Sequence, residues 1–438
     1  MKTAAGIVAG AMFWAVTARA ADAPRADQTA YFALLHDGRF AAAVEKNAGA
    51  QDDVERRFFA AFITYWRLVF DDDNLQLQTL LEHQLDQVVS GDEDDALLWS
   101  GNSHLLLAQL RAWQKRPMAA AFEAKKAKKT LEAAVRGGAE ASDAYFGLGT
   151  YNYMADALPS FVKGLRALLF LPAGNRERGI EQLETAARES THFAFEARVL
   201  LITLYAQRHE KQYARALEQR DLLLAKAPDA IASLYASARL DISLGRNDAA
   251  ILALTKAAER ATTLRDVDPV VLRSIDLLRA RAEYGALRPD RARATAHAAL
   301  ASGAGLTESI KRDLSQIEAA ADKLAEGIDW KAIPSDAAHL SALAGAAPER
   351  PVLALIAGDA QLRLGKPGEA IPWLERAASA PLPPAVKAGC QLRQGQASDL
   401  LGDRAKAIEY YKRAADTPGF AAKDAAVYYQ QSPFRAGA

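Results

Sequence analysis

The chain has 438 residues, of which 50% are hydrophobic and 25% are charged, so it contains ample apolar surface for a folded core. Its 54 Lys and Arg residues balance 54 Asp and Glu residues. This balance argues against a nucleic-acid partner, because nucleic-acid-binding proteins usually carry a strong basic excess. Alanine is abundant and β-branched residues are sparse through most segments, which favours helices.

The first twenty residues have the pattern of a secretory signal peptide. Lys2 supplies the positive start, residues 4–16 form an apolar run, and Ala18-Arg19-Ala20 matches the small-x-small cleavage pattern. An uncleaved membrane anchor is the alternative, but the run is too short to span a bilayer comfortably. We therefore predict a signal peptide over residues 1–20, cleavage before Ala21, and an exported protein, with the periplasm as the expected compartment.

Helical periodicity begins near Asp27 and continues almost to the end, interrupted by short turns rich in Gly, Pro, Asn and Asp. This pattern predicts an all-α protein. A segment rich in Gly and Pro at residues 327–351 is the predicted hinge. It separates an N-terminal solenoid over residues 21–330 from a C-terminal repeat pair over residues 351–438, whose last seven residues we expect to be frayed.

Charged clusters along the N-terminal part have ordinary structural interpretations. The acidic run at residues 71–73 lacks the glycine of a calcium loop, so we interpret Asp73 as a helix cap. Four lysines lie together on a predicted helix, and a solvated outer face is favoured for them over an anion or acidic-lipid site. These four are Lys125, Lys126, Lys128 and Lys129.

Residues 145–189 do not follow the pattern of the rest of the chain. Helices are predicted over 144–157 and 176–189, with an extra element between them at 158–172. The extra element reads as an amphipathic helix over residues 158–171. We predict that it packs its apolar face on neighbouring helices; the alternative is a membrane-surface or partner-binding helix. The side chains that decide between these two readings are Phe161, Lys163, Leu165, Arg166 and Leu168.

The clearest signal is a self-match near the C-terminus, in which small, bulky and glycine positions recur 37 residues apart. The matched residues are Gly358, Gly365, Ala370, Leu374 and Ala377, followed by Gly395, Gly402, Ala407, Tyr411 and Ala414. This spacing resembles the tetratricopeptide repeat, a helix–turn–helix of ~34 residues. The sequence thus predicts a right-handed α-solenoid of roughly eight such helix pairs, carrying the inserted amphipathic helix.

The block at residues 147–183 resembles a group of uncharacterised exported bacterial tetratricopeptide proteins. More distantly, it resembles the eukaryotic tetratricopeptide family of inclusion-body clearance proteins. Asn175 stands where that block usually has Asp and can still cap the following helix. The resemblance implies a non-enzymatic protein and gives no ligand. The residues that carry it are Gly147, Gly149, Tyr151, Asn152, Leu158, Pro159, Gly174, Arg176, Glu177, Gly179 and Leu183.

In a tetratricopeptide solenoid the first helix of each pair lines the concave face, which predicts a groove for a protein or peptide partner. The predicted groove residues are Tyr235, Arg239, Asp359, Arg363, Leu392, Gln396 and Asp399. The first hypothesis is therefore an exported scaffold or adaptor. The alternative is a peripheral membrane or lipid-associated envelope protein that uses the helix at 158–171.

No catalytic residue, metal site or cofactor is predicted from the sequence. The seven histidines are scattered without metal-ligand spacing on a helix. No nucleophile, base and orienting group stand in a readable order. The single cysteine, Cys390, rules out an internal disulfide framework and is interpreted as a buried small side chain on a helix.

Overall fold

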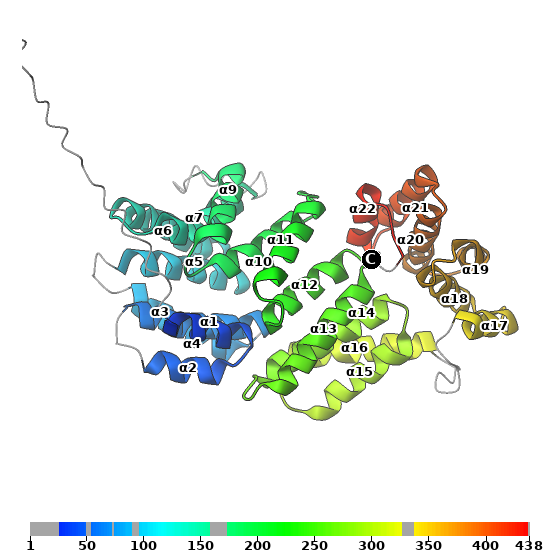
Figure 1. The fold of residues 1–438 in the computed structure, drawn as a ribbon, viewed down its shortest axis with the longest axis horizontal. Helices are drawn as coiled ribbons and strands as arrows, with labels where there is room; N and C mark the ends of the chain where they lie inside the picture. The colour runs from blue at the N-terminus through cyan, green and yellow to red at the C-terminus, as the bar shows by residue number, and fades with distance from the viewer. Residues whose placement is uncertain are drawn as a thin grey trace, which may run out of the picture.

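The computed structural model describes residues 26–49, 54–71, 74–89, 96–157, 173–325 and 337–436. Throughout these ranges the secondary structure is helical, with short turns between helices (Figure 1). The predicted signal peptide and the predicted helix at 158–171 lie outside the described residues. The helices are α1 (Ala26–His36), α2 (Phe40–Ala48), α3 (Val54–Phe70), α4 (Leu75–Val89), α5 (Leu97–Trp113), α6 (Pro117–Arg136), α7 (Ala141–Ala157), α9 (Arg176–Glu189), α10 (Ala194–Tyr205), α11 (Tyr213–Lys226), α12 (Ile231–Ser243), α13 (Asn247–Thr263), α14 (Pro269–Gly285), α15 (Pro289–Ser302), α16 (Glu308–Ala325), α17 (Ala337–Ala346), α18 (Pro351–Arg363), α19 (Pro367–Ser379), α20 (Pro384–Leu400), α21 (Arg404–Asp416) and α22 (Lys423–Gln431).

Successive helices pack as hairpins, and each hairpin stacks on the next, so the predicted all-α solenoid is confirmed. The small positions of the repeat lie where two helices cross. A side chain at Gly358 would place its Cβ 2.7 Å from Leu374, and one at Gly395 would overlap the ring of Tyr411. The four repeat alanines predicted at these crossings, Ala370, Ala377, Ala407 and Ala414, are each 0% exposed.

The glycines of the repeat turns have a backbone reason to be glycine. Gly365 and Gly402 have φ values of 68° and 82°, in the left-handed region that side chains disfavour. Each turn lets the second helix of its pair begin within a few residues, at Pro367 after Gly365 and at Arg404 after Gly402. The tight turn keeps the two helices of each pair antiparallel and in contact.

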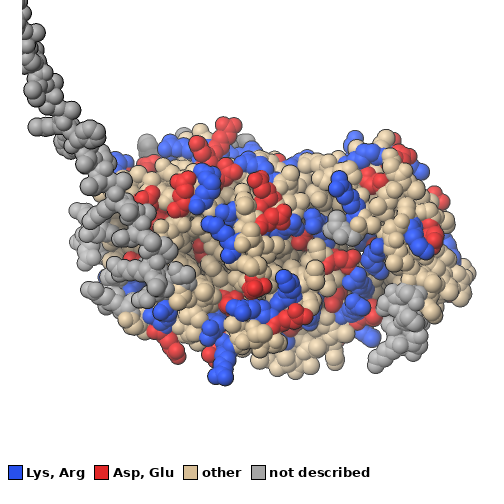
Figure 2. All heavy atoms as spheres, viewed as in Figure 1, with Lys and Arg blue, Asp and Glu red and all other residues tan. Residues whose placement is uncertain are grey.

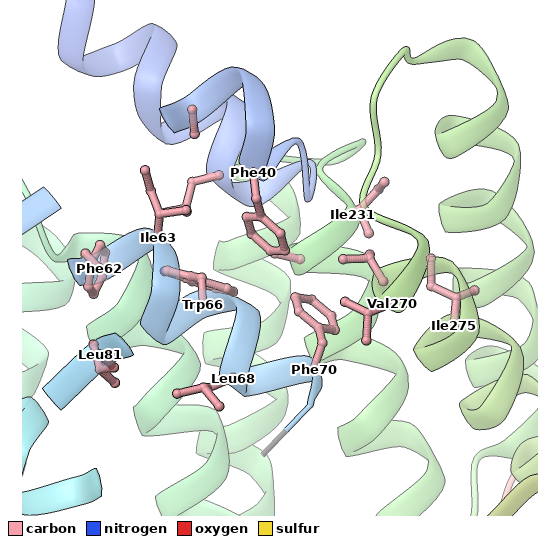
Figure 3. Packing of buried hydrophobic residues seen from close by; sticks show 14 of the residues in the cluster. Phe40, Phe62, Ile63, Trp66, Leu68, Phe70, Leu81, Ile231, Val270 and Ile275 are labelled. Carbon is pink, nitrogen blue, oxygen red and sulfur yellow. The ribbon is translucent and has the colours of Figure 1, made fainter. Parts of the chain in front are cut away.

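The start of the chain docks onto the middle of the chain. The Asp37 carboxylate, in the turn between α1 and α2, accepts hydrogen bonds from Ile231 N at 3.3 Å and from Arg260 Nη2 at 2.9 Å. Figure 3 shows Phe40 of α2 and Phe70 of α3 on one side of this contact. They face Ile231 of α12 and Val270 of α14 on the other side. The first helix pairs therefore close against α12–α14, which the sequence pattern did not reveal.

The C-terminal repeats also fold back onto the middle of the chain. Tyr428 of α22 packs edge-on against Tyr213 with 5.6 Å between ring centroids, and Asp424 forms an ion pair with Arg208. One hydrophobic cluster contains residues from 153 to 244 together with residues from 388 to 429. The two predicted segments thus share part of their core, and α17 lies within the predicted hinge at residues 327–351.

The expectation of a frayed C-terminus is wrong for the described part of the tail. The ring of Phe434 packs on Tyr429 with 5.6 Å between centroids. The Phe434 N–H donates to Asp399 Oδ2 at 2.8 Å. An aromatic anchor and a buried carboxylate hold this segment against α20, and the composition of the tail did not indicate either contact.

Candidate functional site

Aromatic rings fill the space between the first helices of the N-terminal pairs and the start of α10. Phe193, at the start of α10, is 0% exposed and lies at the centre of this cluster. Ring centroids of its neighbours on α3, α5 and α7 lie 5.2–6.3 Å away. Because α3, α5 and α7 are the first helices of successive pairs, their shared inner face is closed by side chains. The neighbouring rings belong to Phe58, Phe62, Trp99 and Phe146.

The two predicted groove residues on α12 differ in accessibility. Tyr235 is partly buried and stands edge-on to Phe70, with 5.1 Å between ring centroids. Arg239, one turn later, is exposed. Of this pair, only Arg239 is exposed, while Tyr235 supports the contact between α3 and α12.

The predicted groove residues on α18 form a buried ion cluster. Asp359 is 6% exposed and accepts hydrogen bonds from both Arg363 and Arg393. The same two guanidinium groups donate to carbonyl oxygens at the end of α14, Arg363 to Ala286 at 2.8 Å and Arg393 to Gly285 at 3.0 Å. These residues therefore fasten the C-terminal repeats to α14, and only Arg363, with its side chain 25% exposed, keeps an accessible edge.

The predicted groove residues on α20 are covered by the chain itself. Leu392 and Gln396 are 2% and 4% exposed, and the side chain of Asp399 is 1% exposed. Asp399 accepts from Arg404, from the Tyr411 hydroxyl at 2.7 Å and from the Phe434 N–H. Burial and the hydrogen bond to Asp399 raise the pKa of the Tyr411 hydroxyl well above its usual range. The role of Leu392, Gln396 and Asp399 as partner contacts stays a prediction. In this arrangement they stabilise the last repeat.

An open polar cleft of about 610 Å³ lies where α7, α9 and the start of α11 meet. Most of its charged lining consists of carboxylates, with two arginines between them. The sequence block 147–183 supplies much of this lining, while the other wall comes from the loop between α10 and α11. The lining residues are Asp156, Gly174, Asn175, Arg176, Glu177, Ile180, Glu181, Glu184, Glu210, Gln212 and Arg215.

Glycines of the resembling block let the two helices beside this cleft, α7 and α9, cross closely. A Cβ at Gly179 would lie 2.6 Å from the Tyr153 nitrogen, and one at Gly149 would lie 2.8 Å from the Gly179 oxygen. The backbones of α7 and α9 therefore cross in direct contact. Asn175 Oδ1 accepts from the Arg178 N–H at 2.9 Å, so the predicted capping of α9 by Asn175 is confirmed.

Glu210 forms the buried end of the cleft. Its side chain is 0% exposed and accepts hydrogen bonds from Arg176, from the Tyr153 hydroxyl at 2.7 Å and from Gln212 at 3.1 Å. Burial works to raise the pKa of Glu210, but the hydrogen bonds from Arg176 and Tyr153 outweigh it, so this pKa is lowered. Glu210 therefore remains ionised and holds Arg176 in place.

The second arginine of the cleft is neutralised in the same way. Arg215 pairs with Glu184 and lies over the ring of Tyr205, with 4.4 Å between the guanidinium carbon and the ring centroid. The Tyr205 hydroxyl also donates to Glu184, at 2.9 Å. Two carboxylates on α9, Glu177 and Glu181, are exposed and form no ion pair with any described residue. The cleft therefore presents two adjacent free negative charges.

The sequence did not predict this cleft. Arg176 and Glu177 were identified through the resembling block, whereas Glu210, Gln212 and Arg215 follow a turn that carries no recognisable motif. On the face shown in Figure 2, basic and acidic side chains are interspersed, in keeping with the balanced composition. Charge patterning along the sequence therefore could not distinguish the cleft from the rest of the surface.

Within the described ranges no group of three or more potential ligands could hold a metal ion. In the same part of the chain, no helix has the length and apolar character needed to cross a membrane. Cys390 is 0% exposed, and burial raises the pKa of its thiol to about 11. The interpretation of Cys390 as a buried small side chain is confirmed.

A family profile described as a tetratricopeptide repeat matches residues 388–417, which contain most of α20 and all of α21. A comparison with curated proteins gave no significant match. Together with the observed stack of helix pairs, the matched repeat defines the class of this protein as an all-α tetratricopeptide-type solenoid. Proteins of this class typically serve as non-enzymatic scaffolds for protein interaction.

Solved structures with a similar course of the chain include yeast Tom70, at 12% identity and a TM-score of 0.36, covering 92% of this chain and 87% of Tom70. Human IFIT1 in complex with PPP-AAAA is 14% identical with a TM-score of 0.31, covering 87% of this chain and 94% of IFIT1. Human IFIT1 with m7Gppp-AAAA is 12% identical with a TM-score of 0.29, covering 87% of this chain and 81% of IFIT1.

Proposed function

We propose that this chain is an exported, non-enzymatic scaffold that binds a protein partner, and that the partner places a basic segment in the polar cleft between α7, α9 and α11. The observation that carries the proposal is the pair of free carboxylates at Glu177 and Glu181. Both arginines of the cleft are paired within the chain, Arg176 with Glu210 and Arg215 with Glu184, and Asp156 accepts a hydrogen bond from the Arg176 backbone N–H at 3.3 Å.

The position of the carboxylates supports recognition of a cationic side chain. Glu177 and Glu181 are four residues apart on α9 and so project from the same side of the helix. A Lys or Arg side chain from a partner would find both carboxylates within reach and the fixed arginines behind them. The buried Glu210 and Tyr153 hold the cleft in shape before a partner binds, which lowers the ordering cost of binding.

The concave groove enters the proposal only through Arg239 on α12, which is exposed, whereas Arg363 on α18 is engaged by Asp359 and Ala286. Aromatic rings close the N-terminal part of the concave face, and the C-terminal tail covers the residues on α20. A partner that used the whole predicted groove would have to displace those intrachain contacts. Binding at the cleft requires no such displacement.

The experiment is an affinity capture from the exported fraction with four forms of the mature protein as bait. The first form is the unchanged chain. The cleft variant is Glu177→Lys/Glu181→Lys, and the groove variant is Arg239→Glu. The matched control is Glu308→Lys/Glu375→Lys, which reverses two exposed carboxylates on α16 and α19.

We expect the unchanged chain and the control to retain the same partner, and the cleft variant to lose it. Retention by the cleft variant with loss by Arg239→Glu would contradict the cleft and favour the concave groove. Circular dichroism of each bait confirms that the substitutions leave the helices folded.

A further inference from the structure

Helix α6 carries a concentration of positive charge that the rest of the chain does not show. Between residues 115 and 136 there are seven Lys or Arg residues and two Glu residues, although the whole chain has 54 of each sign. Five of the seven are lysines. The basic residues are Lys115, Arg116, Lys125, Lys126, Lys128, Lys129 and Arg136.

The outer side of α6 combines these charges with exposed apolar side chains. Its inner side, with Ala127, Leu131 and Ala134, is buried against neighbouring helices. At 100° per residue, the opposite side of the helix aligns Met118 and Phe122 with Lys125, Lys129 and Arg136. Met118 and Phe122 are each 45% exposed, which is unusual for large apolar side chains on a helix that is otherwise well packed.

The two lysines at the centre of this side are free of carboxylate partners. Lys126 pairs with Glu123 at 2.9 Å and Lys128 approaches Glu132 at 3.9 Å. Across the described chain, by contrast, no ion pair involves Lys125 or Lys129. Their charges are therefore available to an outside partner.

Helix α7 packs beside α6, where Lys128 of α6 lies over the ring of Tyr151 at 5.1 Å. We call the outer side of α6 the α6 face; it consists of Met118, Phe122, Lys125, Lys129 and Arg136.

We propose that the α6 face docks onto a phospholipid surface that carries anionic headgroups. Lysine ammonium groups act as point charges, which suits a diffuse layer of anionic headgroups, whereas directed recognition of carboxylates by a protein favours arginine forks. Met and Phe side chains that protrude beside lysines can enter the headgroup region to a shallow depth. The face is a convex helix surface, so it suits a flat lipid layer better than an inserted peptide.

This inference goes beyond protein binding at the cleft and uses other residues. It also differs from the hypothesis of a membrane helix at residues 158–171, because the α6 face contains none of those residues. The two lipid hypotheses predict different sensitive variants, so they can be separated in one experiment.

The test is sedimentation of the full mature chain with vesicles of phosphatidylglycerol and phosphatidylcholine, compared with vesicles of phosphatidylcholine alone. The α6 variants are Lys125→Glu/Lys129→Glu and Met118→Ser/Phe122→Ser. The matched control, Lys256→Glu/Lys311→Glu, reverses two exposed lysines on α13 and α16. The competing variant is Lys163→Glu/Arg166→Glu.

We expect binding to the anionic vesicles only, weakened by added salt and unchanged in the control. Each lysine lost from the face should weaken binding about five-fold, because a basic residue near an anionic surface contributes about 1 kcal/mol. The Met118→Ser/Phe122→Ser variant should also bind more weakly, at unchanged salt dependence. The proposal is overturned if the wild-type chain does not sediment with anionic vesicles, if both α6 variants bind like the control, or if only the Lys163→Glu/Arg166→Glu variant fails to bind.

Discussion

Replacing Phe193 by alanine tests directly whether the concave face of the N-terminal helix pairs is closed. Phe193 is 0% exposed, and its ring is surrounded by aromatic rings on three helices. Those neighbours are held by contacts of their own, for example Phe58 against Trp99 at 5.1 Å, so they cannot collapse fully into the space. We expect Phe193→Ala to lower the free energy of unfolding by ~3–5 kcal/mol, the range for removal of a buried phenylalanine ring.

The assay is urea unfolding followed by tryptophan fluorescence, since Trp66, Trp99 and Trp113 all belong to this aromatic region. The matched control is Phe122→Ala, because Phe122 is 45% exposed and its loss should change stability by no more than ~0.5 kcal/mol. An equal, small effect of the two substitutions would refute the reasoning. It would mean that the rings around Phe193 do not form a packed core and that the concave face is open to a partner.

Four further predictions concern single positions. Ala407→Leu should overpack the helix crossing of the last repeat and lower the unfolding free energy by ~1–3 kcal/mol, so an unchanged melting midpoint would contradict the register. His192 and Ser190 hold the pKa of the Asp143 carboxyl below its ordinary value despite burial. The ionised Asp143 therefore stabilises the folded chain fully above about pH 3.9, and this contribution is lost as the pH falls through the lowered pKa. The difference in unfolding free energy between wild type and Asp143→Asn should shrink over that acidic range. Cys390 should resist a thiol reagent at mildly alkaline pH until the chain unfolds, because burial raises its pKa to about 11, and rapid modification of the native protein would show otherwise. Mass measurement of the exported protein should give a mature N-terminus at Ala21, and an intact Met1 would indicate a tethered chain instead.

The local features of the fold were predictable because they follow from short-range periodicity. The spacing of Gly395, Tyr411 and Ala414 indicated a close helix crossing, and the structure places these residues at that crossing. The end of α7 at Ala157 and the start of α9 at Arg176 could be read from turn and capping residues. Such signals need only the few residues that touch within one helix pair.

The contacts between distant helix pairs could not be read from the sequence. Asp37 meets Ile231 across 194 residues, and Arg208 meets Asp424 across 216 residues. Their sequence neighbourhoods resemble other turns and helix starts. Other long-range contacts cover most predicted groove residues, such as those of Arg363 and Arg393 with the end of α14 and of Phe434 with Asp399. The general groove pattern assumes an open solenoid without such contacts. The cleft was not predicted, because the resembling block indicated no ligand site and Glu210 is drawn into the cleft by Tyr153 and Arg176 from other helices.

Crosslinking of the captured partner complex, with mass-spectrometric mapping, tests most directly the claim that the partner binds at the polar cleft. Lys211 is exposed and lies between the cleft residues Glu210 and Gln212, so it reports contacts there. Lys366 and Lys387 are exposed or partly exposed beside the C-terminal repeats and report contacts at the covered groove. We predict that crosslinks from the partner concentrate on Lys211 and disappear in Glu177→Lys/Glu181→Lys. Crosslinks concentrated on Lys366 and Lys387, and unaffected by that variant, would contradict the account.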